Sequence, residues 1–524
     1  MSEPSGRLER TCSLLVLLLA AALRLLPLRA ALPYLGYVDE GHILHPTITL
    51  LKTRSLDPQR YLHPTLLPYL TALAVNAYRP VYRRWHGRSL LADLPPDETY
   101  YDAVSPPELI LIARLLVVAF GVATVAIAGL LASRLAGPAA GLLAALFTAI
   151  CPALICRGSI VILDTVAAFC VIAALAVAQR LEEEPSGGAP GLALLAGAFS
   201  GLALTAKYTP VTVLAAVLVT VLTRPEPPRR KLALAATACA ACAAAAAITM
   251  PPLLLRTRDV IQAVLQQARY YADVSSQSPN NPDTSYLRQL LSARECGLGL
   301  AATAAAGLLL LLRGHRRTLL SWAAFTAALL FPLLLHPYRP FRQLLTLVPP
   351  LCVAAGLAIA SLLRERRLVP LGVAAAALVT GTLAAGSARY LRSRLALTDT
   401  RTTAVEWLAS MTTPASTVLV EEELAFLPSE LARVGAEVHV VPRQHLRSLA
   451  ASRRFDYLVA APFDLWGRTR PDWIAESEEW SAWLASMNPE GTIGTQPTPV
   501  YPNFWRGNMQ VLSVYKGSEA FRAQ

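Results

Sequence analysis

Charged residues are scarce in this chain: they make up 16% of its 524 residues, whereas hydrophobic residues make up 54%. This balance excludes an ordinary soluble protein and is typical of a chain that crosses a membrane many times. The net charge of +12 could suggest a nucleic-acid partner, but the arginines gather in short breaks between apolar runs. Because that placement is the one that orients membrane proteins, we expect no nucleic-acid partner.

Several motifs of soluble enzymes are also absent. No glycine-rich phosphate loop follows any expected strand, so nothing in the sequence supports a nucleotide site. The eight cysteines include a CxxC pair, Cys239 and Cys242, but this pair lies in an alanine-rich apolar run with no histidine nearby. We interpret such cysteines as small apolar helix residues, and we predict no disulfide framework.

Long apolar runs, in contrast, are abundant. A helix needs about 20 mostly apolar residues to span a bilayer. We predict eleven spans, at residues 12–32, 109–133, 138–156, 159–178, 190–206, 208–223, 232–254, 297–312, 319–335, 344–363 and 368–388. Arg24 and Arg29 interrupt the first run and no clear cleavage site follows it, which favours an uncleaved anchor over a signal peptide.

The arginines also predict an orientation. With a cytoplasmic N-terminus, every strongly basic short loop lies on the cytoplasmic side, as at 224–231, 313–317 and 364–367. The loops at 33–108 and 255–297 then face outward. The abundance of Ala, Leu and Arg favours a bacterial source, so we expect a multi-pass protein of the plasma (inner) membrane.

The long apolar runs end near residue 389, and short strand-like and helix-like segments alternate after it. Alternation of this kind predicts a small α/β domain with a parallel sheet. Its strands are expected at residues 416–422, 437–441, 455–461 and 508–516. The predicted fold class is therefore a polytopic α-helical membrane domain, residues 1–389, followed by a soluble extracytoplasmic α/β domain, residues 390–524.

The most distinctive stretch comprises residues 37–70, directly after the first apolar run. It places Asp39 and Glu40 where a membrane helix should emerge into water. A carboxylate there can take a proton from an attacking hydroxyl or amine. Equally, Asp39 can cap a helix that begins near Glu40. The segments 40–54 and 62–85 have the pattern of helices that lie in the membrane interface.

Two ionisable residues flank the start of the fourth span. Asp164 lies within the span, where a charge is costly and usually faces a cavity or a partner. Arg157 precedes it by seven residues, so the two share a face if one helix begins near Arg157. A structural ion pair that ties two helices together is an equal alternative.

Three cations lie on the predicted outer side, against the positive-inside trend: Lys207, Arg339 and Arg342. Together with Tyr338 they indicate an anionic ligand such as a phosphate, because arginine offers a planar fork of donors and lysine a compact charge. For any one of them, contact with anionic lipid headgroups is an equal alternative.

Four histidines of the predicted outer loops, His42, His45, His63 and His336, could bind a divalent metal ion together with Glu40. No HExxH or comparable spacing occurs among them, and imidazoles at a membrane interface often only form hydrogen bonds. A divalent metal and simple hydrogen bonding both stay open as roles for these residues.

With these residues in view, the chain resembles the GT-C glycosyltransferases that use polyprenyl-phosphate sugars. Within them it is most similar to the protein O-mannosyltransferase and ArnT-like group, glycosyltransferase family 39. The resemblance covers about residues 10–390 and is carried by the stretches YVDEGH, SLDPQRYLHPT and HPYRPFR. The chain departs from the pattern at His63-Pro64-Thr65, where the aminoarabinose branch often has a Lys-Pro-Pro-like stretch. The resemblance therefore indicates the reaction class but not the donor sugar or the acceptor.

The resemblance implies a reaction and a site. The reaction would be an inverting transfer of a sugar from a polyprenyl-phosphate donor to an acceptor protein, lipid or glycan on the outer face. Asp39 would be catalytic, with Glu40 as its acidic neighbour. The donor phosphate would be bound by Arg157, Lys207, Tyr338, Arg339 and Arg342, with support from Asp164, His42, His63 and His336.

Two other functions stay open at this point. A transporter or flippase for an anionic lipid or sugar could use the same intramembrane charges, although the sequence shows no internal repeat and its first loop is large. In a non-catalytic interaction protein, the domain after residue 389 would be the working part and the helices its anchor, but anchoring needs far fewer than eleven spans.

Overall fold

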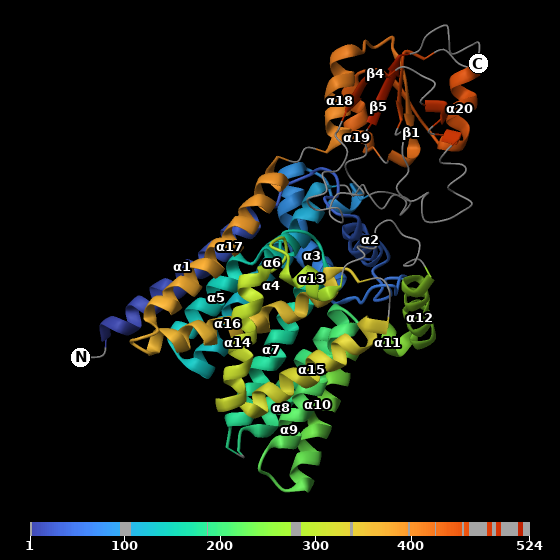
Figure 1. Cartoon of the computed structure of the whole chain (residues 1–524). Coiled ribbons are helices and arrows are strands. Elements are labelled where there is room, and N and C mark those ends of the chain that lie inside the picture. Colours follow the sequence, from blue (N-terminus) through green and yellow to red (C-terminus); the bar gives the residue numbers. More distant parts are fainter. Residues whose placement is uncertain are drawn as a thin grey trace.

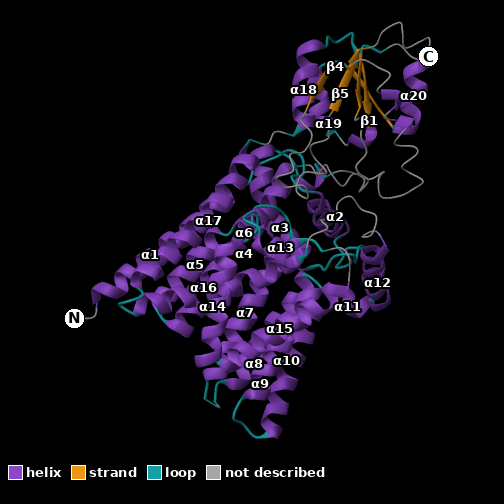
Figure 2. Cartoon of the chain, in the orientation of Figure 1, coloured by secondary structure: helices purple, strands orange, loops and turns teal. Residues whose placement is uncertain are grey.

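The computed structural model describes residues 3–94, 106–185, 187–273, 285–335, 339–396, 399–424, 426–452, 455–460, 479–480, 482–484, 489–493 and 512–516. The chain forms two parts: a large bundle of helices, and a smaller part near the C-terminus in which helices flank a sheet (Figure 1). Every strand described lies in the smaller part (Figure 2). The predicted division of the chain at residue 389 stays a prediction.

The bundle contains seventeen described α-helices and three short 3₁₀ helices. The α-helices are α1 Glu3–Leu25, α2 Val38–Thr53, α3 Leu66–His86, α4 Pro107–Ala136, α5 Pro138–Ile150, α6 Pro152–Arg157, α7 Leu163–Glu183, α8 Ala189–Ala206, α9 Val213–Thr223, α10 Pro228–Thr249, α11 Pro252–Leu255, α12 Thr257–Asp273, α13 Tyr286–Leu291, α14 Gly297–Gly314, α15 Arg316–Leu335, α16 Val348–Arg364 and α17 Val369–Leu395. The 3₁₀ helices are η1 Leu90–Ala92, η2 Thr209–Thr212 and η4 Phe341–Leu347.

Among the described residues, eight helical segments are long and apolar enough to cross a membrane: α4, α7, α8, α10, α14, α15, α17, and α16 together with η4. Two shorter apolar helical segments, Pro138–Ile150 and Thr209–Thr223, coincide with further predicted runs. The helical membrane class is therefore confirmed. The predicted number of eleven spans stays a prediction.

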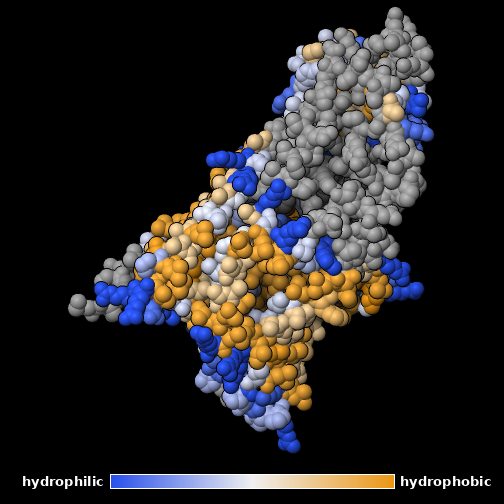
Figure 3. Space-filling model, in the orientation of Figure 1, coloured by the Kyte–Doolittle hydropathy of each residue, from blue (hydrophilic) through white to orange (hydrophobic). Residues whose placement is uncertain are grey.

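The surface of the bundle matches a membrane environment. Hydrophobic side chains cover most of the helical part on the face shown in Figure 3, and hydrophilic side chains gather at its lower tip. Large apolar side chains such as Leu232, Ile248 and Phe331 are 71–76% exposed. Because lipid is as apolar as these side chains, such exposure is stable in a bilayer, whereas it would be unfavourable over so wide an area in water.

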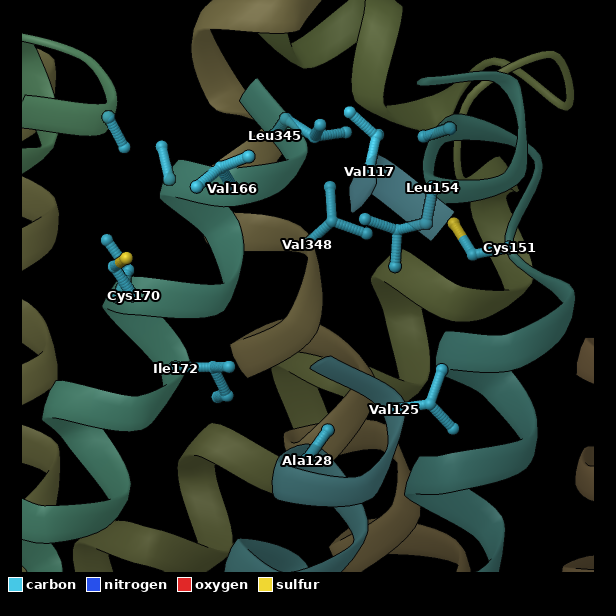
Figure 4. Close-up of a cluster of buried hydrophobic side chains, with 14 of the residues drawn as sticks. Val117, Val125, Ala128, Cys151, Leu154, Val166, Cys170, Ile172, Leu345 and Val348 are labelled. Atoms are coloured by element: carbon cyan, nitrogen blue, oxygen red, sulfur yellow. The ribbon is translucent and has the colours of Figure 1, made fainter. Parts of the chain in front are cut away.

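Small residues let the helices pack closely. On α8, a Cβ atom added at Gly197 would lie 2.1 Å from the carbonyl oxygen of Ala238 on α10. One turn further along, a Cβ at Gly201 would lie 2.2 Å from the carbonyl oxygen of Cys242. Association of helices in lipid depends on such close contact. Deeper in the bundle, α4, α6, α7, η4 and α16 contribute apolar side chains to one core (Figure 4).

The span predicted at 138–156 is not one helix, and this expectation was wrong. The helix α5 ends at Ile150 and the short helix α6 begins at Pro152. Proline cannot continue a helix because it has no N–H and its ring clashes with the preceding turn. The break brings the end of α6 to the region where α2, α7 and η4 meet.

The C-terminal part contains a five-stranded sheet with the strand order β2-β1-β3-β5-β4. Its strands are β1 Thr417–Glu421, β2 Glu437–Val441, β3 Tyr457–Ala460, β4 Pro489–Ile493 and β5 Leu512–Lys516. Its helices include α18 Thr400–Met411, α19 Pro428–Leu431 and α20 Arg443–Ser452. The strand β1 is parallel to β2 and β3, as predicted, whereas β5 is antiparallel to β3 and β4. The sheet is therefore mixed, and β4 was missed.

Candidate active site

A cavity of about 100 Å³ lies where the first loop meets the bundle. Five separate regions of the chain line it: α2 with the segment before α3, the start of α7, the segment between α8 and α9, α12, and the α15 to η4 region. Its lining residues are Asp39, Ile43, Leu62, His63, Pro64, Ile162, Leu163, Asp164, Lys207, Tyr208, Thr209, Gln267, Leu333, Arg342 and Gln343. Of the predicted site residues, the cavity thus brings together Asp39, His63, Asp164, Lys207 and Arg342.

Asp39 is in the first turn of α2, where a carboxylate is stabilised by the helix dipole. The N-cap is Tyr37 and no side chain caps the helix, so the alternative in which Asp39 is the cap was wrong. The carboxylate of Asp39 forms an ion pair with Arg342 of η4. The same guanidinium donates a hydrogen bond of 3.1 Å to the hydroxyl oxygen of Tyr37.

A second ion pair faces the same cavity. Lys207 Nζ lies 2.5 Å from a carboxylate oxygen of Asp164. Asp164 is in the first turn of α7 and Lys207 is the C-cap of α8, so each charge complements the dipole of its own helix. Their side chains are 5% and 23% exposed, respectively, so the lysine is the member of the pair that a ligand can reach more easily.

Arg157 and Asp164 do not share a helix face, and that expectation was wrong. The helix α6 ends at Arg157 and α7 begins six residues later, at Leu163. Arg157 instead pairs with Glu295, at 2.7 and 3.0 Å, in a fork that uses both terminal nitrogens. It also lies over the ring of Phe341, 5.4 Å from the centroid. Arg157 therefore ties α6 to the segment before α14, beside the cavity residues of η4.

Glu40, the neighbour of Asp39, has no exposed surface and lies outside the cavity lining. Its two oxygens accept hydrogen bonds of 2.8 Å from Arg114 of α4, and others from the backbone N–H groups of Gly36 and Val161. Burial alone would raise the pKa of Glu40. The Arg114 charge and the hydrogen bonds outweigh that effect and lower this pKa below its usual value.

Two histidines of the first loop, His42 and His63, are half-buried and close together. The rings of His42 and His63 meet edge to face, with 5.3 Å between their centroids. Burial, followed by the charges of His45 and Arg60, lowers the pKa of His42 to about 4. Burial, His42 and Lys207 lower the pKa of His63 to about 3. Both rings are therefore neutral near pH 7 and can donate or accept hydrogen bonds.

A metal site finds no counterpart in the described part of the chain. Within it, no three His, Cys, Asp or Glu residues are grouped as the ligands of a metal ion would be. His336 and Tyr338, both predicted site residues, lie outside the described residues. Arg339 is described, but it lies outside the cavity lining; its Nη2 donates to the carbonyl oxygen of Leu334 at 3.2 Å.

The SLDPQRYLHPT stretch is folded by its own side chains. The Asp57 carboxylate accepts hydrogen bonds from the N–H of Gln59 at 2.9 Å and from the hydroxyl of Tyr61 at 2.6 Å. Local bonds of this kind are what Asp provides in turns. Tyr208 of the bundle donates to the carbonyl oxygen of Tyr61 at 2.7 Å. These contacts hold the loop so that His63 reaches the cavity.

Sequence reasoning missed several contributors. Gln267, Gln343 and Tyr208 line the cavity, but single uncharged residues give no signal in one sequence. Arg114 and Glu295, the partners of the predicted residues Glu40 and Arg157, could have been found. Arg114 is a charge inside a predicted span, which by itself indicates a buried partner or a functional role.

The sequence matches a known family over part of its length. Residues 62–237, about a third of the chain, match the model of a family described as dolichyl-phosphate-mannose-protein mannosyltransferase. No curated protein matches the chain significantly by sequence.

Solved structures share the fold of nearly the whole chain. The structure of ArnT from Cupriavidus metallidurans bound to undecaprenyl phosphate is similar with a TM-score of 0.57, 13% identity and coverage of 99% of both chains. The archaeal oligosaccharyltransferase AglB from Archaeoglobus fulgidus, in complex with an inhibitory peptide and a dolichol-phosphate, has a TM-score of 0.52 at 13% identity. That match covers 99% of this chain and 75% of AglB.

At this identity the structural likeness shows the fold, and the match of residues 62–237 shows similarity to a family of glycosyltransferases. Both agree with the resemblance carried by Asp39, Glu40 and the later basic residues, and the predicted resemblance is confirmed. By its fold and by the match of residues 62–237, the chain is similar to the membrane glycosyltransferases of the GT-C type, in particular to ArnT and the protein O-mannosyltransferases.

Proposed function

We propose that the protein transfers a sugar from a polyprenyl-phosphate carrier to an acceptor on the extracytoplasmic face of the membrane, with inversion at the anomeric carbon. The observation that carries this proposal is the cavity in which Asp39 lies with the cations Arg342 and Lys207. A general base and phosphate-binding cations are the two things that such a displacement needs.

In the proposed reaction, Asp39 takes the proton from the acceptor hydroxyl or amine as that oxygen or nitrogen attacks the anomeric carbon. The bond between this carbon and the phosphate oxygen breaks, and its electron pair stays on the oxygen. The polyprenyl phosphate leaves with one more negative charge than it had in the donor. Arg342 and Lys207 stabilise that developing charge, which is where preorganised cations contribute most to catalysis.

The other predicted residues take supporting roles in this proposal. Glu40 fixes the start of α2 through Arg114 and so positions Asp39. Asp164 orients Lys207, and neutral His63 forms hydrogen bonds with the sugar or the acceptor. Arg157, held by Glu295, keeps η4 in place through Phe341. The outward orientation of the cavity rests on the basic loops, which are cytoplasmic by the positive-inside rule.

The test is glycosyl transfer by the purified full-length protein in lipid, with a panel of polyprenyl-phosphate sugars as donors. Asp39→Asn should lower transfer by about 10² to 10⁴-fold, the usual contribution of a general base. The variant should keep its thermal unfolding temperature, because the Asp39 side chain is 23% exposed.

The matched control is Glu108→Gln, which removes a negative charge of similar exposure, 26%, from the first turn of α4 and outside the cavity lining. It should keep most of the activity. Full transfer by Asp39→Asn would overturn the proposal. Movement of the donor across liposome membranes without any glycosidic product would favour the transporter alternative instead.

A further inference from the structure

The proposed base and the proposed phosphate-binding groups are engaged with one another in this structure. Arg342 is paired with Asp39, and Lys207 with Asp164. All four line the same cavity of about 100 Å³. Each cation of the cavity lining therefore already faces a carboxylate, and a phosphate that enters must compete with these carboxylates for the same donors.

The two acidic residues of the motif differ in how firmly they are held. Glu40 is fully buried, forms an ion pair with Arg114 and accepts hydrogen bonds from two backbone N–H groups. An anion from solvent therefore cannot take its place beside Arg114. Asp39 and Arg342, in contrast, are 23% and 21% exposed, at the wall of the cavity. An ion pair at such a position contributes little net free energy and can exchange partners with an incoming anion.

Arg342 is suited to such an exchange. Its guanidinium presents a fork of N–H donors, which matches two phosphate oxygens better than it matches one carboxylate oxygen and the hydroxyl of Tyr37. The backbone that carries it is held by the N–H of Gln343, which donates to the carbonyl oxygen of Pro340 at 3.1 Å, and the Gln343 side chain accepts a hydrogen bond from Tyr286 of α13. The arginine can therefore change its partner through its side chain alone.

Resting on the proposed function, we infer that Asp39 and the donor phosphate compete for Arg342, so that donor binding releases the base. While Asp39 faces the guanidinium, its negative charge is neutralised and it is a weak proton acceptor. Once the phosphate takes Arg342, Asp39 loses the cation and gains an anionic neighbour, and both changes increase its affinity for a proton. The acceptor is then deprotonated only when a donor is in place, and the donor binds first.

The test is the binding affinity of a polyprenyl phosphate without a sugar, measured on the purified full-length protein in nanodiscs of neutral phospholipid. If Asp39 competes for Arg342, Asp39→Asn should bind this lipid about two- to fivefold more tightly than the wild type, the range expected for loss of a partly exposed ion pair. The gain should vanish in the double variant with Arg342→Gln, since there is then no cation to compete for. Where Arg342→Gln does not fold, Arg342→Lys replaces it and should reduce the gain.

Glu108→Gln serves as the control for charge alone, and its affinity should equal that of the wild type. An affinity of Asp39→Asn equal to or weaker than that of the wild type would overturn the competition. The competition would also be overturned if Asp39→Asn increased the lipid affinity by the same factor in a protein that already carries Arg342→Gln. Sugar transfer by the wild type, measured on the same preparation, separates the competition from the proposed function. If the wild type transfers sugar but Asp39→Asn binds the lipid no more tightly, the competition alone is rejected. If the wild type neither binds the lipid nor transfers sugar, the proposed function is rejected as well.

Discussion

Two neighbouring carboxylates, Asp39 and Glu40, have opposite environments although they are adjacent in the sequence. Successive residues of a helix point about 100° apart, as 3.6 residues complete a turn. Since both residues are in the first turn of α2, one side chain faces the cavity and the other faces α4. The exposed member is suited to proton transfer, and the buried member to structural support.

Replacement of Glu40 by Gln should therefore destabilise the protein. It leaves the Arg114 guanidinium buried without a counter-charge, which typically costs about 3–5 kcal/mol. The expected result is a clear fall in the thermal unfolding temperature of the purified protein in lipid. The same replacement at the adjacent position, Asp39→Asn, is the control and should leave that temperature nearly unchanged. Equal unfolding temperatures for both variants would contradict this assignment of roles.

At the scale of elements, the break between α5 and α6 depends on Pro152 and on a residue far away in sequence. Pro152 has no N–H, and the N–H of Ala153 bonds the carbonyl oxygen of Glu295, so the last turn of α5 lacks its helical donors. Arg24 of α1 replaces them: its guanidinium donates to the carbonyl oxygens of Thr148 at 3.4 Å and Ala149 at 3.2 Å. The cation also complements the negative end of the α5 dipole.

Arg24→Met should accordingly destabilise the bundle even though it makes the first helix more apolar. It removes the donors of two buried carbonyl groups, at a cost of about 1–3 kcal/mol each. Thermal unfolding in lipid is the measurement, and Arg29→Met is the control because Arg29 is exposed. An unfolding temperature of Arg24→Met equal to that of the control would show that the carbonyl groups find other partners.

At the scale of the whole molecule, one residue of the first loop connects the two parts of the chain. Tyr34 is fully buried, and the guanidinium of Arg401 on α18 lies 3.8 Å from its ring centroid. Its hydroxyl oxygen accepts a hydrogen bond of 3.4 Å from the N–H of Leu427. Because Tyr34 precedes α2 by only four residues, the C-terminal part is attached next to the element that carries Asp39.

Tyr34→Ala should loosen the C-terminal part without unfolding it. The ring contact with Arg401 is desolvated, and such contacts contribute about 2 kcal/mol. We expect faster cleavage by a protease in the connection between α17 and α18, measured on the intact protein in lipid. Tyr34→Phe retains the ring and should resemble the wild type. If all three proteins are cleaved at the same rate, Tyr34 does not hold the two parts together.

The sequence by itself determined the class of the protein. Apolar runs of span length are visible in one dimension because lipid requires about 20 apolar residues wherever a helix crosses it. The motif around Asp39 and the outer cations Lys207 and Arg342 could likewise be singled out, since charges at membrane edges are costly and few. The family match and the shared fold confirmed the resemblance that these residues carried.

Only the tertiary structure decided which charges face one another. The sequence paired Arg157 with Asp164 by helical spacing, but α6 ends at Arg157 and Asp164 belongs to the next helix, α7, which begins at Leu163. Their partners are Glu295 and Lys207 instead. Spacing predicts neighbours within one helix, whereas contacts between helices depend on how the bundle packs. For the same reason the difference between Asp39 and Glu40, one at a cavity and one buried on Arg114, exists only in the folded chain.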